Sequence, residues 1–107
     1  MRLIAEALGE VERITPDILD QTLREDSFGK FVVLVGPDGE FLQAGCVWDS
    51  SARCAAFVRE TGSDPWVLEC REQGALRRAE GLLTGDEVRV AFGEYLRGER
   101  RWWTSRA

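Results

Sequence analysis

Carboxylates are the side chains of this chain that could do acid–base chemistry, because the sequence contains no histidine. Without histidine the chain lacks the commonest general base and the Ser-His-Asp and Cys-His arrangements. Two carboxylates can still act as acid and base when they converge on a substrate. The closely spaced acidic pairs are Glu25 with Asp26, Asp38 with Glu40, and Asp86 with Glu87. Each pair has a simpler role at a helix end, in a hairpin turn or at a helix N-terminus, so we expect no enzymatic activity.

Three cysteines are the other reactive side chains: Cys46, Cys54 and Cys70. Their odd number and the absence of a CxxC spacing indicate neither a disulfide framework nor a zinc site. A nucleophilic Cys54 would need a base that the chain does not have. The GPDGE stretch at 36–40 has no P-loop lysine and predicts a turn, not a phosphate site. We therefore expect reduced, mostly buried thiols, and no metal or other cofactor.

The charge of the chain points to a basic protein partner. The 107 residues fit one domain, 1–107, and include 19 acidic and 14 basic side chains, a net charge of −5. Binding to phosphate backbones needs a cationic surface, so we expect no nucleic-acid partner. Residues 1–49 hold ten acidic and four basic side chains, a net charge of −6. The acidic surface is therefore expected in the N-terminal half.

The hydropathy pattern predicts a cytoplasmic protein with no membrane partner. No apolar run approaches the ~18 residues that a membrane span requires. The N-terminal stretch 1–12, MRLIAEALGEVE, is interrupted by Glu6 and has neither the apolar core nor the cleavage site of a signal peptide.

The first half of the chain predicts one helix and one hairpin. Residues 3–14 favour an extended edge segment, and Pro16 after Thr15 starts a helix expected over 16–25. Apolar runs on both sides of GPDG predict a hairpin over 31–46. Its first strand, FVVLV at 31–35, is apolar at every position, which predicts a central strand with a layer on each face. Gln43 in the return strand is either a satisfied core amide or an exposed edge residue.

The second half of the chain predicts a hairpin between two helical segments. Residues 49–62 favour a helix that ends at Gly62, with a strand as the competing reading. The strands WVLECRE and ALRRAEG, separated by Gln-Gly, predict a second hairpin over 66–81. Thr84 and Glu87 form a T-x-x-E capping box at the start of a helix that reaches Arg97. The expected fold is α+β: an antiparallel sheet built from two hairpins, with about three helices packed on it.

Tryptophans mark two candidate contact regions. Trp48 beside Asp49 covers the core edge or, if it is exposed, suits a basic partner. After the last helix, Arg100 and Arg101 precede Trp102 and Trp103. We expect an indole of this segment to fold back over Tyr95 while the arginines stay in solvent, and an uncovered indole to form a homodimer contact instead.

Pieces of the sequence between residues 31 and 103 resemble the small immunity proteins of bacterial polymorphic toxin systems. The similarity lies in three motifs that members of this group carry: an aromatic-apolar-Gln second strand, an apolar-Leu-Glu-apolar-Arg strand and a terminal EVhxAFxxYLxGxxxW helix, where h is an apolar residue. The matching residues are Phe41, Leu42, Gln43, Val67, Leu68, Glu69, Cys70, Arg71, Glu87, Val88, Ala91, Phe92, Tyr95, Leu96, Gly98 and Trp102. The resemblance implies an α+β sheet with flanking helices, and a non-catalytic protein that binds and blocks a toxin made by the same cell.

The leading hypothesis is therefore an immunity protein that neutralises a cognate toxin through an acidic surface. The partner is a basic protein, either a toxin domain or an effector. The candidate partner-binding residues are Glu25, Asp26, Asp38, Glu40, Trp48 and Asp49. Two alternatives stay open: an acidic, dimeric chaperone that holds a secreted effector, and a small enzyme that uses carboxylates alone.

Overall fold

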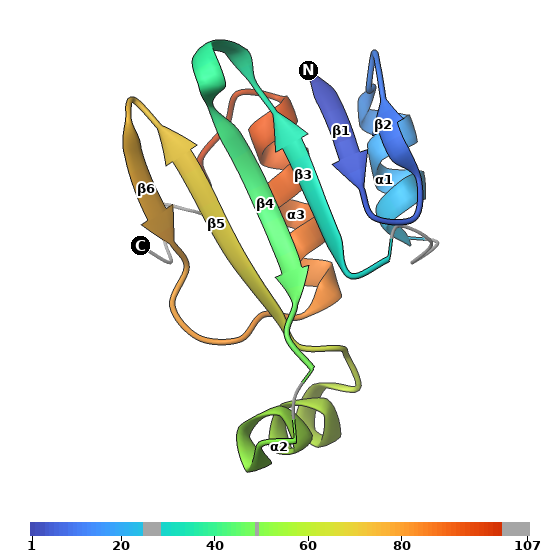
Figure 1. Ribbon diagram of the computed structural model, residues 1–107. Helices are drawn as coiled ribbons and strands as arrows, with labels where there is room; N and C mark the ends of the chain where they lie inside the picture. Colours follow the sequence, from blue (N-terminus) through green and yellow to red (C-terminus); the bar gives the residue numbers. More distant parts are fainter. Residues whose placement is uncertain (25–28, 49, 102–107) are drawn as a thin grey trace.

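The computed structural model describes residues 1–24, 29–48 and 50–101 of the chain. Its strands form one six-stranded antiparallel sheet in the order β2-β1-β3-β4-β5-β6 (Figure 1). The strands are β1 (Arg2–Ala5), β2 (Gly9–Val11), β3 (Phe31–Val35), β4 (Phe41–Cys46), β5 (Trp66–Glu72) and β6 (Ala75–Arg78). Together with three α-helices the sheet gives an α+β fold, which confirms the predicted class.

The two predicted hairpins are present, and a third one precedes them. β3 pairs with β4 across the short 3₁₀ turn Pro37–Gly39, and β5 pairs with β6. The segment expected to be a single extended edge folds back on itself, because β1 and β2 pair antiparallel and Gly9 takes a positive φ of 67°. β1 also pairs with β3, so β3 is an inner strand, as predicted.

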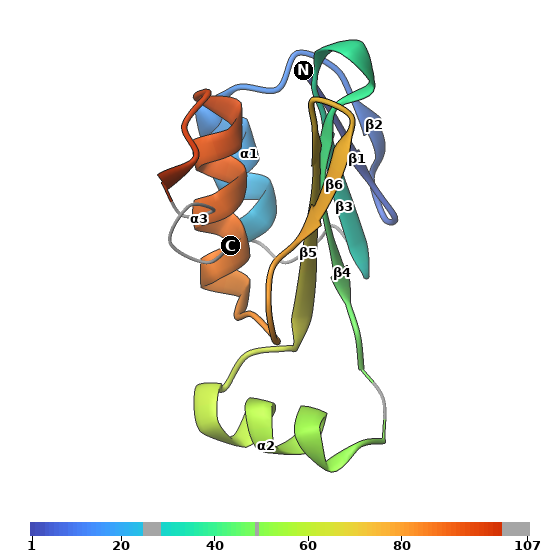
Figure 2. The same cartoon turned by 90° about the vertical axis from the view of Figure 1, so that its left-hand side faces the viewer.

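Two helices cover one face of the sheet, and the third lies beyond its end. α1 (Pro16–Arg24) and α3 (Gly85–Leu96) lie against each other on the same face (Figure 2). Arg89 of α3 forms ion pairs with Asp20 of α1, at 3.6 Å, and with Asp86, at 2.8 Å. α2 (Ala52–Thr61) connects β4 to β5 at the end of the sheet (Figure 1). Residues 52–61 are therefore helical, and the strand alternative for this segment is wrong.

The hydrophobic core lies between the sheet and the α1–α3 pair. Side chains at alternate strand positions are buried, as a sheet with one covered face requires. Phe92 of α3 is fully buried among them. Other fully buried strand and helix side chains of this cluster are Leu3, Leu19, Val32, Leu34, Leu68 and Val88.

The opposite face, which we call the open face, has no described element on it (Figure 2). In β3, Phe31, Val33 and Val35 alternate with the buried residues Val32 and Leu34 and so point away from the helices. Phe31 is 41% exposed. The prediction of a layer on each face of this strand is wrong for the open face within the described residues.

Gly62 ends α2 and the Thr84–Glu87 box starts α3, as the sequence indicates, whereas α2 begins at a cap other than Asp49 or Ser50, the two residues that the sequence offers for it. Ser51 caps α2 through its Oγ, which accepts from Cys54 N at 3.2 Å, and Gly62 ends the helix with a φ of 71°. At α3, Thr84 Oγ1 accepts from Glu87 N and Glu87 Oε1 accepts from Thr84 N, both at 3.1 Å. The predicted capping box is confirmed.

Replacing Thr84 by alanine tests the contribution of this capping box. We expect T84A to lower the free energy of unfolding by about 1 kcal/mol, because the amide of Glu87 loses its acceptor. Urea unfolding of the variant and of the unchanged chain measures the difference. V90A is the control, because Val90 lies on the same helix, is 49% exposed and takes no part in the cap. Equal losses in the two variants would contradict a specific role of the cap.

Candidate functional site

The predicted contact residues do not form a single patch. Asp38 lies in the turn between β3 and β4, Glu40 directly precedes β4, and Trp48 follows the opposite end of β4, beside α2 (Figure 1). Since β4 has six residues, these two ends are roughly 20 Å apart. Glu25, Asp26 and Asp49 lie outside the described residues, as do Trp102 and Trp103.

The two acids at the β3–β4 turn differ in what they contact. Asp38 takes a positive φ of 57° at the tip of the turn and its side chain is exposed. Glu40 is half-buried, and its Oε1 accepts from the backbone N–H of Gln73 at 3.4 Å. Glu40 therefore links the β3–β4 turn to the β5–β6 turn, and of these two acids Asp38 is the one fully presented to a partner.

Trp48 is exposed and is held by an acid that sequence reasoning missed. The indole has 54% of its surface exposed, and its Nε1–H donates to Asp64 Oδ1 at 2.8 Å. Asp64 is exposed and lies 16 residues further along the chain, on the far side of α2. Of the two roles predicted for Trp48, the structure has the exposed one. No local sequence signal connects these two residues, because α2 brings them together.

The open face contains a hollow centred on a glycine. In the sheet register Gly45 lies between Phe31 of β3 and Val67 of β5. The hollow has a volume of about 350 Å³, and Val33, Gln43 and Glu69 also border it. Gln43 Nε2 donates to Glu69 Oε2 at 3.3 Å. Gln43 is thus a half-buried amide on the open face of an inner strand: it is hydrogen-bonded, as one alternative expects, but it lies neither in the core nor at an edge.

A polar cluster of Cys70, Glu72, Tyr95 and Arg100 lies between the C-terminal end of α3 and the sheet. Arg100 forms an ion pair with Glu72, and its guanidinium lies 4.4 Å from the centre of the Tyr95 ring. Cys70 Sγ lies 3.6 Å from Glu72 Oε1 as a hydrogen-bond donor. The expectation that both arginines stay in solvent is wrong for Arg100, whereas Arg101 is exposed and pairs with Glu99 at 2.9 Å.

Burial makes the two acidic protons of this cluster hard to remove. It raises the pKa of the Cys70 thiol to about 12, and the negative charge of Glu72 acts in the same direction. Burial also raises the pKa of Tyr95 to about 12. A thiol that stays protonated at neutral pH is a poor nucleophile, so Cys70 is a core residue. None of the three cysteines forms a disulfide, and Cys54 and Cys70 are buried, as predicted.

The acidic pair at the start of α3 has structural partners. Asp86 pairs with Arg89, and Glu87 belongs to the capping box.

Among the described residues no group of three or more His, Cys, Asp or Glu side chains is arranged to hold a metal ion. No helix in the described part of the chain combines the length and apolarity needed to cross a membrane.

Comparison of the chain with known protein families, with curated proteins and with solved structures finds no match. The resemblance to immunity proteins is therefore carried by the sequence motifs alone. The motif residues Gln43, Glu69 and Arg71 lie on the open face, whereas Phe92 and Tyr95 belong to the core. The open face and Trp48 with its acid are two features of this structure that a protein partner could recognise.

Replacing Tyr95 by phenylalanine tests the buried hydroxyl of the polar cluster. Tyr95 Oη has no hydrogen-bond partner among the described residues, and a Cβ at Gly36 would lie only 2.8 Å from it. We expect Y95F to raise the free energy of unfolding by about 1 kcal/mol, because a buried hydroxyl without a partner is costly. A loss of stability in Y95F would contradict the absence of a partner.

The pH dependence of stability gives a second measurement on the same residue. The pKa of Tyr95 is raised in the folded chain from 10.0 to about 12, so the unfolded chain loses this proton first. Below pH 10 the hydroxyl is protonated in both states, so its titration does not change the free energy of unfolding. As the pH rises from 10 towards about 12, the free energy of unfolding falls, and Y95F loses less stability over that range. Tyr95 is the single tyrosine of the chain, so ultraviolet absorbance of tyrosinate reports its titration directly.

Proposed function

We propose that this chain is a non-catalytic protein-binding domain, an immunity protein that neutralises a cognate bacterial toxin. The observation that carries the proposal is the exposed Trp48 ring next to the carboxylate of Asp64. Exposed tryptophans are typical anchors of protein interfaces, where a few such side chains supply most of the binding energy. The acid beside the ring favours a partner of positive charge.

The open face supports the same proposal as a broad contact surface. Phe31 is exposed there beside the hollow at Gly45, which could take an apolar side chain of the partner. The β1–β2 hairpin at one edge of the sheet, with the residue that follows it, carries exposed Glu6, Glu10 and Glu12, of which Glu10 pairs with Arg2 at 2.7 Å. An apolar surface bordered by acids is complementary to a folded, basic toxin domain.

Neutralisation requires fast capture and slow release. The net charge of −6 over residues 1–49 would steer a basic domain towards the N-terminal half of the chain. Desolvated contacts at Trp48 and in the hollow would then set the dissociation rate. Inhibition of this kind needs no catalytic group, in agreement with the structural roles of Glu87 and Cys70.

The open face also favours the second hypothesis, a dimeric chaperone for a secreted effector. An uncovered apolar surface can hold an unfolded segment as well as a folded domain. The two functions differ in the state of the bound partner, which is extended for a chaperone and folded for an immunity protein. A carboxylate-only enzyme is the third hypothesis, and no described structural feature favours it.

Substitution of Trp48 tests the proposed function. The tagged chain is expressed in its native host, the captured protein is identified by mass spectrometry, and its affinity is measured by calorimetry. We expect W48A to weaken binding at least about tenfold, because the anchor is lost. I18A is the matched control, since Ile18 is a large side chain on α1 that is 44% exposed.

The identity and folded state of the captured protein decide between the hypotheses. A folded protein that stops growth when expressed alone, and no longer does so with this chain, supports an immunity protein. A secreted effector bound in an extended state supports the chaperone. Equal affinities of W48A and the unchanged chain would show that the partner binds elsewhere.

Filling the hollow tests whether the open face belongs to the same contact. A Cβ added at Gly45 meets no atom within 4 Å, and the residue lies within a strand, so G45V should fold with unchanged or higher stability. We expect G45V to weaken partner binding at least about tenfold, because valine occupies the hollow. Urea unfolding verifies the fold. Full affinity in a stable G45V would remove the open face from the proposal.

A further inference from the structure

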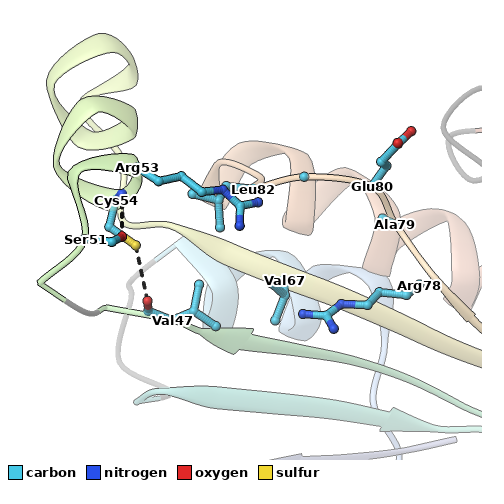
Figure 3. A pocket seen from close by; sticks show the side chains of 10 residues that line it. Val47, Ser51, Arg53, Cys54, Val67, Arg78, Ala79, Glu80 and Leu82 are labelled. Atoms are coloured by element: carbon cyan, nitrogen blue, oxygen red, sulfur yellow. Dashed lines mark hydrogen bonds between the residues drawn. The ribbon is translucent and has the colours of Figure 1, made fainter.

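A second hollow lies between α2 and the C-terminal part of the sheet. It shares Val67 with the hollow at Gly45, and the proposed function does not use its other walls. This cleft has a volume of about 780 Å³, within the range of small-molecule sites (Figure 3). Its walls come from the end of β4, the first turn of α2, β5, and the segment that leads from β6 towards α3.

Much of the cleft wall is apolar and is fixed by hydrogen bonds. Val47, Val67, Ala79 and Leu82 form this apolar part. Val47 N–H donates to the carbonyl of Pro65 at 3.0 Å, and Ala79 N–H donates to the carbonyl of Leu68 at 3.0 Å. The Cys54 thiol donates to the carbonyl of Val47 at 3.4 Å, which ties the first turn of α2 to the end of β4. The shape of the cleft therefore does not depend on a ligand.

Two arginines extend into this cleft from opposite walls. Arg53 comes from α2 and Arg78 from β6 (Figure 3). Neither takes part in the ion pairs found between described residues. Two acids of this region, Glu69 on β5 and Glu80 in the cleft wall, face other directions or partners. Glu69 lies opposite Arg78 in the sheet register but accepts from Gln43, and the carboxylate of Glu80 points away from both guanidinium groups.

We propose that this cleft binds a ligand that carries one carboxylate on an apolar body. The planar, forked guanidinium groups of Arg53 and Arg78 match a carboxylate, and the apolar body would pack on Val47, Val67 and Leu82. The net charge of −5 of the chain disfavours ligands with many negative charges. The carboxylate belongs either to a free organic acid or to the C-terminus of a peptide, and both present the same chemistry.

A titration of the isotope-labelled full chain by NMR tests this proposal without the protein partner. The probe is phenylacetate, and its neutral isostere phenylacetamide is the matched control ligand. We expect saturable shifts of the backbone amides of Val47, Cys54, Val67 and Ala79 with phenylacetate, and much weaker shifts with phenylacetamide. Equal affinities of the two ligands, or no saturable shift with either phenylacetate or the peptide acid described below, would overturn the proposal.

Substitution of the arginines assigns the binding to these two side chains. R53Q and R78Q are each expected to weaken phenylacetate binding about tenfold, because each removes a charge-assisted hydrogen bond. Both residues are exposed, so the variants should keep the fold, which circular dichroism verifies. R59Q is the control, because Arg59 is an exposed residue of α2 that does not line the cleft. Unchanged affinity in R53Q and R78Q would overturn the proposal.

The source of the carboxylate is resolved by a short peptide that ends in phenylalanine. Tighter binding of the peptide acid than of phenylacetate, with loss of binding for the amidated peptide, would support a chain terminus. Tighter binding of phenylacetate would support a free organic acid. Because these titrations need no toxin, their outcome is independent of the proposed immunity function.

Discussion

In the part of the chain that the structure describes, helices cover only one face of the sheet, and the rest of the structure depends on this constraint. α1 and α3 take up one face, so each inner strand must supply apolar side chains at the positions that point to the helices. Leu34 and Leu68 at such positions are fully buried, whereas Phe31 on the other face is 41% exposed. The side chains of the open face do not have to pack in the core, so they are available to contact a partner.

Elements with strong local signals could be predicted from the sequence. The T-x-x-E box of Thr84 and Glu87, the GPDG turn and the stop of α2 at Gly62 each act within a few residues, and local hydrogen bonds fix the result. The hairpin of β1 and β2 was harder to predict, because three- and four-residue strands carry little periodicity. The sequence of β3 is apolar at every position, which shows that neither face of the strand carries a charged side chain. It does not tell which of the two faces a helix covers.

The candidate site depends on contacts between distant residues, and less of it could be predicted. The exposure of Trp48 and its hydrogen bond to Asp64 depend on how α2 leaves the sheet. Arg53 and Arg78 come from separate elements and lie on one cleft because the chain returns through β5 and β6. The role of Glu40 likewise depends on the adjacent turn at Gln73. The sequence indicates the residue types of a site, while the topology decides which of them meet.

The connection that carries α2 is longer than the sheet requires. β4 and β5 are antiparallel neighbours, and a turn of about two residues can join such strands. Residues 47–65 are used instead, and this insertion holds Trp48, Arg53 and Asp64, while Cys54 and Pro65 are the buried side chains among its described residues. Mutations there can alter what the protein recognises at little cost to folding. The insertion thus gives selection a place to diversify specificity within an unchanged scaffold.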